Sequence, residues 1–135
     1  MDKFREKKTP IVNVKVANIR PNYDNLKEWI KDPNNVYIGR RGVVFVTEIN
    51  PETGMIGKKR FPAYDSIWAN PFKIGKDGDR EEVLRKYKEY ITIRLDREPQ
   101  LLKELAKLKG KNLGCWCYPD PCHGDILKEI MITKL

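Results

Sequence analysis

The sequence predicts an α/β fold: a single small domain in which helices pack on a mixed sheet with a parallel core, in a Rossmann-like arrangement. Three observations predict it. Apolar segments typical of strands stand at 11–16 and 111–115, and segments with helical periodicity separate and follow them. Residues 42–61 have strand-forming residues on both sides of a turn, as an inserted β-hairpin has. The chain of 135 residues has no Ser/Gly-rich or proline-rich linker and is the size of one domain.

The first forty residues carry strand, helix and strand signals in turn. Ile11 to Val16 alternates apolar and polar residues, as a half-buried strand does. Asn22 or Asp24 is expected to cap a short helix, which ends before Pro33 because proline disfavours helical geometry in the preceding residue. A brief strand is expected at 36–38.

Residues 42–61 are expected to form the inserted hairpin. Its turn, Asn50 to Gly54, has proline and glycine at the positions that a tight turn needs. The returning strand carries three consecutive cations, Lys58, Lys59 and Arg60. Such cations can bind a phosphate backbone, and they are equally a common protection of exposed edge strands against pairing with other chains.

An irregular, aromatic segment at 62–78 follows the hairpin. Trp68 and Phe72 predict an ordered loop, in which they either anchor the core or stack on a bound base. The proline after Asn70 holds that residue extended. An extended Asn suits an amide directed at a ligand, and it equally suits an amide bonded to the backbone of its own turn.

Two helices and a strand–loop–helix unit are expected in the second half. Asp79 and the acid three residues later form a capping pair at the start of a long helix. A second helix is expected from Pro99 to Lys109, with Gly110 as its C-terminal stop. An apolar strand at 111–115 then enters a proline-containing loop, and a last helix starts near Asp125.

Charge and composition favour an acidic partner and a location inside the cell. The formal net charge of +8 comes from 27 basic and 19 acidic residues, and a positive field attracts nucleotides and nucleic acid. The alternative is that these interleaved charges simply solvate the surface. No apolar run approaches the about 20 residues of a membrane span. We therefore expect a cytoplasmic protein without a membrane partner, in the host cytoplasm if viral. Residues 1–10 are expected to be a flexible tail and residues 11–135 the domain.

The segment from Gly114 to Asp125 contains all three cysteines and the only histidine of the chain. It joins a strand to a helix. Open α/β sheets bind ligands at such junctions, because the carboxyl ends of strands meet the unpaired N–H groups of the next helix. This segment is the candidate site, and an odd cysteine count in a reducing compartment favours free thiols or a metal over disulfides.

The first hypothesis for this segment is a zinc site. Three thiolates and one imidazole make an acceptable tetrahedral zinc shell. The ligands would be Cys115, Cys117, Cys122 and His123. Residues two apart on a strand lie about 6 to 7 Å apart at Cα, so Cys115 and Cys117 share a metal only if the strand bends.

The second hypothesis is a metal-free binding or catalytic pocket. Cys122 would gain thiolate character at a helix start, His123 can act as an acid or base, and Asp125 supplies a carboxylate. These three are the candidate catalytic residues. The candidate ligand-binding residues are Arg40, Asn70, Gly124, Cys115 and Cys117. The combination suits a nucleotide or another phosphorylated small molecule, and hydrolysis of an N-glycosidic or phosphoester bond is a compatible reaction.

The third hypothesis is structural. Buried cysteines act as small hydrophobic residues, and His123 caps a helix. The same fold would then serve as a nucleic-acid-binding module, in which Lys58, Lys59 and Arg60 grip phosphates and the Cys/His loop, with or without zinc, only stabilises the domain.

Three blocks of the chain resemble one family. The blocks are Val36-Tyr37-Ile38-Gly39-Arg40, Asn70-Pro71-Phe72 with Lys73 to Gly75, and the GCWC…PCHGD segment from Gly114 to Asp125. They resemble an uncharacterised family catalogued as domain of unknown function 4326, which occurs in bacteria, phages and other viruses. The resemblance runs from about Val12 to Leu127. It implies a compact α/β domain with a site made from the Arg40, Asn70 and Cys115–Asp125 blocks. The chain departs from the family's shorter form by the inserted hairpin and by Ala69, where glycine is common.

Overall fold

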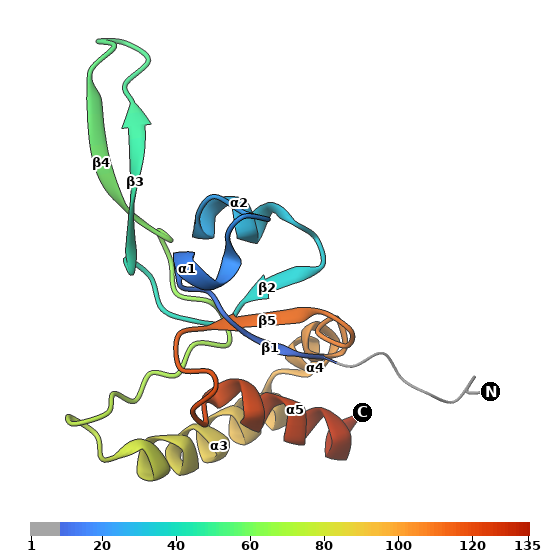
Figure 1. Cartoon of the computed structure of the whole chain (residues 1–135). Helices are drawn as coiled ribbons and strands as arrows, with labels where there is room; N and C mark the ends of the chain where they lie inside the picture. The colour runs from blue at the N-terminus through green and yellow to red at the C-terminus, as the bar shows by residue number, and fades with distance from the viewer. Residues whose placement is uncertain (1–8) are drawn as a thin grey trace.

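Three short parallel strands form the centre of the computed structural model, which describes residues 9–135 (Figure 1). The strands are β1 (Ile11–Asn13), β2 (Asn35–Tyr37) and β5 (Asn112–Cys115), in the order β1-β5-β2. Leu113 of β5 pairs with Ile11 on one side and Val36 on the other. The last strand of the chain therefore lies between the first two, and its carboxyl end lies next to theirs.

Helices cover both faces of this sheet (Figure 1). The short helices α1 (Val16–Ile19) and α2 (Leu26–Lys31) lie on one face, and α3 (Arg80–Arg97) and α5 (His123–Lys134) lie on the other. Helix α4 (Pro99–Ala106) contributes Leu101 and Leu105 to the same hydrophobic cluster as α3 and α5. Among residues 9–135, no helix has the length and apolar character to cross a membrane.

Successive residues of β5 face opposite sides of the sheet, and the buried residues accordingly form two hydrophobic clusters. Leu113 and Cys115 belong to the cluster of α3, α4 and α5, whereas Gly114 faces the cluster of α1 and α2. A Cβ at Gly114 would lie 2.5 Å from the Trp29 ring and 2.8 Å from Val14. Glycine is therefore required there, because the tryptophan ring of α2 packs directly on the strand backbone.

The inserted hairpin forms a sheet of its own. Strands β3 (Val44–Ile49) and β4 (Ile56–Phe61) pair only with each other, and the hairpin projects away from the helices and the parallel sheet (Figure 1). The predicted α/β class, with a parallel core and an inserted hairpin, is confirmed, and the Rossmann-like detail stays a prediction. The expected attachment of the hairpin to the edge of one mixed sheet is corrected. The N–H groups of Gly42 and Val43 bind the carbonyls of Pro62 and Phe61, so the arms continue to pair with each other at their base.

The predicted capping residues agree with the start of one helix and differ by a few residues at another. Asp79 caps α3 as predicted, accepting a hydrogen bond from the Glu82 N–H at 2.9 Å. Helix α2 is capped by Asn25 rather than by Asn22 or Asp24, with the Glu28 N–H as donor. Asn25 is the cap because an N-cap residue immediately precedes the first helical residue, which is Leu26 in α2.

The N-terminal boundary differs from the expectation. Thr9 and Pro10 fall within the predicted flexible tail, but Thr9 accepts a hydrogen bond from the Gly110 N–H and the Pro10 carbonyl accepts one from Leu113. Residues 1–8 of the predicted tail lie outside the described residues. The first strand is also shorter than predicted, because α1 begins at Val16.

Candidate functional site

A cavity of about 440 Å³ lies beyond the carboxyl ends of β2 and β5, where the sequence predicted a ligand site. This volume is within the range of small-molecule sites. We call it the site pocket. Its walls come from the end of β2, the loop before α3, the start of α3 and the β5–α5 segment. Its lining includes Arg40, Asn70, Phe72, Lys73, Arg80, Cys115, Trp116, Cys117, Cys122 and His123.

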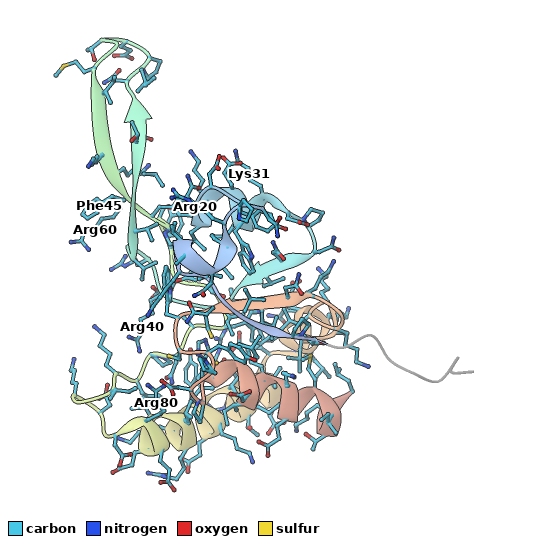
Figure 2. The ribbon with its side chains drawn as sticks, in the orientation of Figure 1. Arg20, Lys31, Arg40, Phe45, Arg60 and Arg80 are labelled. Atoms are coloured by element: carbon cyan, nitrogen blue, oxygen red, sulfur yellow. The ribbon has the colours of Figure 1, made fainter. Side chains whose placement is uncertain are left out.

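Arg40 links the end of β2 to the loop before α3. Its Nε donates to the Asn70 carbonyl at 2.9 Å, and its Nη2 donates to the Phe72 carbonyl at 2.7 Å. Arg40 points from the sheet toward the α3 side of the molecule (Figure 2). The guanidinium is thus held by backbone oxygens that carry no full negative charge, and its positive charge stays available at the pocket wall.

Asn70 uses its amide within the protein. Its Oδ1 accepts from the Phe72 N–H at 2.9 Å, and its Nδ2 lies 3.4 Å from the Val83 carbonyl. Of the two roles considered for this amide, the structure has the bond to its own turn. Asn70 lines the pocket and shapes the loop, so that the Phe72 ring stands at the pocket edge against Tyr90. Trp68, by contrast, is buried in the core.

Two cations of the pocket, Lys73 and Arg80, were not among the predicted site residues. Arg80, the first residue of α3, donates to the Pro121 carbonyl at 2.9 Å and lies 3.8 Å from the Asp120 carboxylate. A hydrogen bond to the Cys117 sulfur further raises the pKa of Arg80. Lys73 stands in the loop, and among residues 9–135 no acid pairs with its ammonium. Arg80 reaches the pocket through the packing of α3, and Lys73 reaches it through the loop whose Asn70 and Phe72 carbonyls bind Arg40.

Cys115 and Cys122 lie against each other. Their Sγ atoms are 3.3 Å apart, one at the end of β5 and the other immediately before α5. The Cys122 thiol and the backbone N–H groups of Tyr118 and Cys117 lower the pKa of Cys115 to about 6, against the opposing effect of burial. The pKa of Cys122 is raised, because its proton is held by Cys115 and because it is buried.

His123 is nearly buried between the sheet and α3. Its Nε2 lies 2.6 Å from the Ile38 carbonyl, and its ring packs edge-on against Tyr87 at 5.2 Å. A carbonyl can only accept, so Nε2 carries the proton. Burial lowers the pKa of His123, so the imidazole is neutral near neutral pH.

Two of the predicted site residues point elsewhere. The Asp125 carboxylate accepts from the Cys122 N–H at 3.0 Å and thereby closes the first turn of α5. Gly124 is buried under the sheet, where a Cβ would lie 2.5 Å from Ile11. Gly124 therefore permits close packing of α5.

The predicted zinc ligands do not form a complete shell in this arrangement. Cys115 and Cys122 are adjacent, but the Nε2 of His123 points to Ile38 and the Cys117 sulfur contacts Arg80. Within residues 9–135, no group of three or more His, Cys, Asp or Glu side chains is arranged to hold a metal ion. Zinc binding stays a prediction.

The hairpin cations Lys58, Lys59 and Arg60 do not line this pocket, and the alternation of side chains along β4 places them on two faces. Opposite partners in an antiparallel pair share a face. Arg60 pairs with Phe45 and Lys58 pairs with Thr47 on one face, whereas Lys59 lies on the other face, 3.6 Å from the Glu48 carboxylate. Arg60 covers the Phe45 ring at 5.1 Å, and both point away from the hairpin axis (Figure 2).

Comparisons with known proteins agree with the blocks described above. A family model described as "Domain of unknown function (DUF4326)" matches residues 22–133. An uncharacterized 12.4 kDa protein from the nrdA-td intergenic region of Enterobacteria phage T4 is 37% identical over 67 residues, 49% of this chain and 60% of that protein. An uncharacterized protein of Acanthamoeba polyphaga mimivirus is 36% identical over 74 residues, 49% of this chain and 53% of that protein. The chain thus spans between half and two thirds of these curated relatives. No solved structure matches.

Proposed function

Because the chain belongs to the DUF4326 family, whose description names no reaction, we propose its function from the geometry of the site pocket: the protein binds a nucleotide or another phosphorylated small molecule there. The observation that carries this proposal is the convergence of Arg40, Lys73 and Arg80, from three separate segments, on one cavity. Three cations that line one cavity match a phosphate group, which carries up to two negative charges and several acceptor oxygens.

The remaining walls support the rest of such a ligand. The Phe72 ring and the Trp116 indole line the same cavity and offer apolar surface to a base or another planar group. The Trp116 Nε1 donates to the Tyr37 hydroxyl at 2.9 Å, which holds the indole in place. A ligand with a planar head and a phosphate is therefore the class that this pocket fits best.

The proposal is limited to binding. The hydrolase-like role predicted for Cys122, His123 and Asp125 stays a prediction. The Asp125 carboxylate accepts the Cys122 N–H, and Asp125 does not line the cavity.

Isothermal titration calorimetry with adenosine monophosphate, ribose phosphate, inorganic phosphate and the uncharged nucleoside adenosine tests the proposal. Lys73→Gln and Arg80→Gln each remove one pocket charge. Lys76→Gln and Arg85→Gln are matched controls, because they remove the same charges from exposed positions in the same loop and helix. A charged hydrogen bond contributes about 1.5 to 3 kcal/mol, so each pocket variant should weaken phosphate-containing ligands about tenfold or more.

Two results would overturn this proposal. One is binding of adenosine as tight as that of its monophosphate. The other is an equal loss of affinity in the control variants, which would assign the effect to the general positive field.

A second candidate function is supported by the hairpin. The face that carries Phe45, Lys58 and Arg60 has two cations and no acid, whereas the opposite face neutralises Lys59 with Glu48. A two-stranded β-ribbon is an element that the major groove of DNA admits, and cations on it can bind phosphates. We propose nucleic acid as the partner of this face.

Fluorescence anisotropy with a short DNA duplex at several salt concentrations tests this second function. The double variant Lys58→Gln/Arg60→Gln should bind more weakly and show a smaller dependence on salt, by about one unit of slope for each phosphate that the variant no longer neutralises. Lys59→Gln is the matched control on the opposite face and should change neither. Binding that is insensitive to salt, or equal losses in all variants, would contradict the proposal.

A further inference from the structure

We propose that Cys115 and Cys122 form a reversible dithiol–disulfide pair, oxidised by hydrogen peroxide or by a small-molecule disulfide, while Cys117 stays a free thiol. This site of modification is independent of the ligand proposed for the pocket, because it concerns two sulfur atoms that already touch.

The distance between the sulfurs carries the inference. They lie 3.3 Å apart, and a disulfide bond is about 2.05 Å long, so each sulfur has to move well under 1 Å. The cysteines belong to different elements, the end of β5 and the residue before α5, and the loop between them contains Tyr118, Pro119, Asp120 and Pro121. Two sulfurs held in contact by two packed elements are prepared for bond formation without rearrangement of the fold.

The surroundings assign a role to each sulfur. The Cys115 sulfur lies against the Cys122 thiol, and this thiol and the backbone N–H groups of Tyr118 and Cys117 lower the pKa of Cys115, which favours its thiolate. The pKa of Cys122 is raised, so its thiol stays protonated to a higher pH than that of Cys115. Cys115 is therefore the attacking sulfur and Cys122 the resolving one.

The steps balance with one oxidant molecule. The Cys115 thiolate attacks one oxygen of hydrogen peroxide, which breaks the O–O bond and leaves Cys115 as a sulfenic acid plus hydroxide. Hydroxide takes the Cys122 proton to give water. The Cys122 thiolate then attacks the Cys115 sulfur and expels a second hydroxide, which takes a proton from solvent. Overall, two thiols lose two electrons and two protons, and one peroxide becomes two waters. With a small-molecule disulfide, the two electrons and two protons reduce it to two thiols.

The exposure of the three cysteines limits the size of the oxidant and distinguishes the paired thiols from Cys117. The side chains of Cys115 and Cys122 are only 1% and 2% exposed, but both line the site pocket, so a small oxidant can reach them through it. Cys117 is more exposed and contacts the Arg80 guanidinium. Within residues 9–135, its sulfur has no hydrogen bond to another sulfur. Cys117 is thus the more accessible thiol but has no sulfur partner. We therefore expect the disulfide to join the two buried cysteines and to leave Cys117 free.

The experiment is thiol counting and disulfide mapping on the full chain. Reduced protein is treated with hydrogen peroxide or oxidised glutathione, unfolded under alkylating conditions and analysed by mass spectrometry. We expect one alkylated cysteine instead of three, and a peptide link between Cys115 and Cys122. Dithiothreitol should restore three alkylated cysteines.

Two cysteine variants test whether oxidation follows the contact between Cys115 and Cys122 or the exposure of Cys117. Cys117→Ser touches only the sulfur that stays free, and it should form the internal disulfide as readily as the natural chain. Cys122→Ser should stop at a sulfenic acid or a mixed disulfide on the remaining cysteines. If that variant does not fold, the mapping in Cys117→Ser decides the question alone.

Three outcomes would overturn the proposal. One is a link that includes Cys117. Another is three free thiols after treatment that fully oxidises dithiothreitol. The third is reduced protein that carries a tightly held zinc ion by native mass spectrometry and resists oxidation until the metal is chelated, which would assign both sulfurs to a metal instead.

Discussion

Arg40 and Arg60 lie twenty residues apart, but their guanidinium groups have opposite roles. Arg40 donates to the carbonyls of Asn70 and Phe72, which come from a distant loop, and so it holds the pocket wall together. Arg60 donates to Gly42 of its own hairpin and covers the exposed ring of Phe45. The pocket side of the molecule is thus built from interactions between distant segments, whereas the hairpin depends on interactions between its own residues. Substitutions should therefore be costly in the body and tolerated in the hairpin.

The largest contrast is expected for two strand glycines. Gly114→Val places side-chain atoms against Trp29 and Val14, because even a Cβ would lie 2.5 Å from the first and 2.8 Å from the second. Overpacking of this kind costs about 1 to 3 kcal/mol, occasionally more. Gly57→Val in β4 meets no atom within 4 Å and gains strand propensity. Urea unfolding should show a large loss of stability for the first variant and no loss for the second. Equal effects would show that the hairpin is packed as tightly as the body.

The second contrast concerns two tyrosine hydroxyls. The buried Tyr87 hydroxyl donates to the Trp68 carbonyl at 2.7 Å, so Tyr87→Phe leaves that carbonyl without its donor and should cost about 1 to 3 kcal/mol. Tyr64 is 82% exposed, and Tyr64→Phe should change stability by less than about 0.5 kcal/mol. Thermal unfolding of the two variants side by side measures the difference.

The third contrast returns to the two arginines. Arg40→Lys keeps the charge but cannot make both hydrogen bonds of the guanidinium, so it should lower the free energy of unfolding by about 1 to 2 kcal/mol. Arg60→Lys should cost a few tenths of a kcal/mol at most, because its partners are exposed. Hydrogen exchange should also reveal faster opening of the loop around Phe72 in Arg40→Lys. A slow, unchanged loop would contradict the role given to Arg40.

The smallest expected effect is a dependence on pH. Burial lowers the pKa of His123, so between that lowered value and the unfolded value near 6.5 the unfolded chain binds a proton that the folded chain does not. Stability from the neutral imidazole is therefore complete above about pH 6.5 and falls as the pH falls below it, by at most about 1.4 kcal/mol per pH unit. His123→Gln keeps a donor for the Ile38 carbonyl without this titration, so its stability should fall less between pH 7 and pH 5.5. Because His123 is the only histidine, no other imidazole contributes.

Local chemistry was enough for much of the architecture. The Asp79 cap, the α/β class and the start of the last helix near Asp125 all follow from neighbouring residues, since capping and periodicity act within one or two turns. The family resemblance implied a site made from the Arg40, Asn70 and Cys115–Asp125 blocks, and residues of all three blocks border the same cavity.

Other features depend on which segments pack together. Local patterns identify Arg80 only as part of a helix start, and the packing of α3 against the sheet brings its guanidinium to the pocket. The sequence predicts Asp125 and Gly124 as ligand groups, but helix geometry directs one to the Cys122 N–H and the other under Ile11.

By itself, the sequence determined the kinds of element, their order and the segment that holds the sulfur and imidazole groups, because these depend on interactions over a few residues. Only the tertiary structure decided that Cys115 touches Cys122, that Lys59 lies against Glu48, and that Lys73 and Arg80 share a cavity with Arg40. The physical reason is that a side chain's partner is set by the register of a strand pair or the packing of a helix, and both involve residues that are distant in the chain.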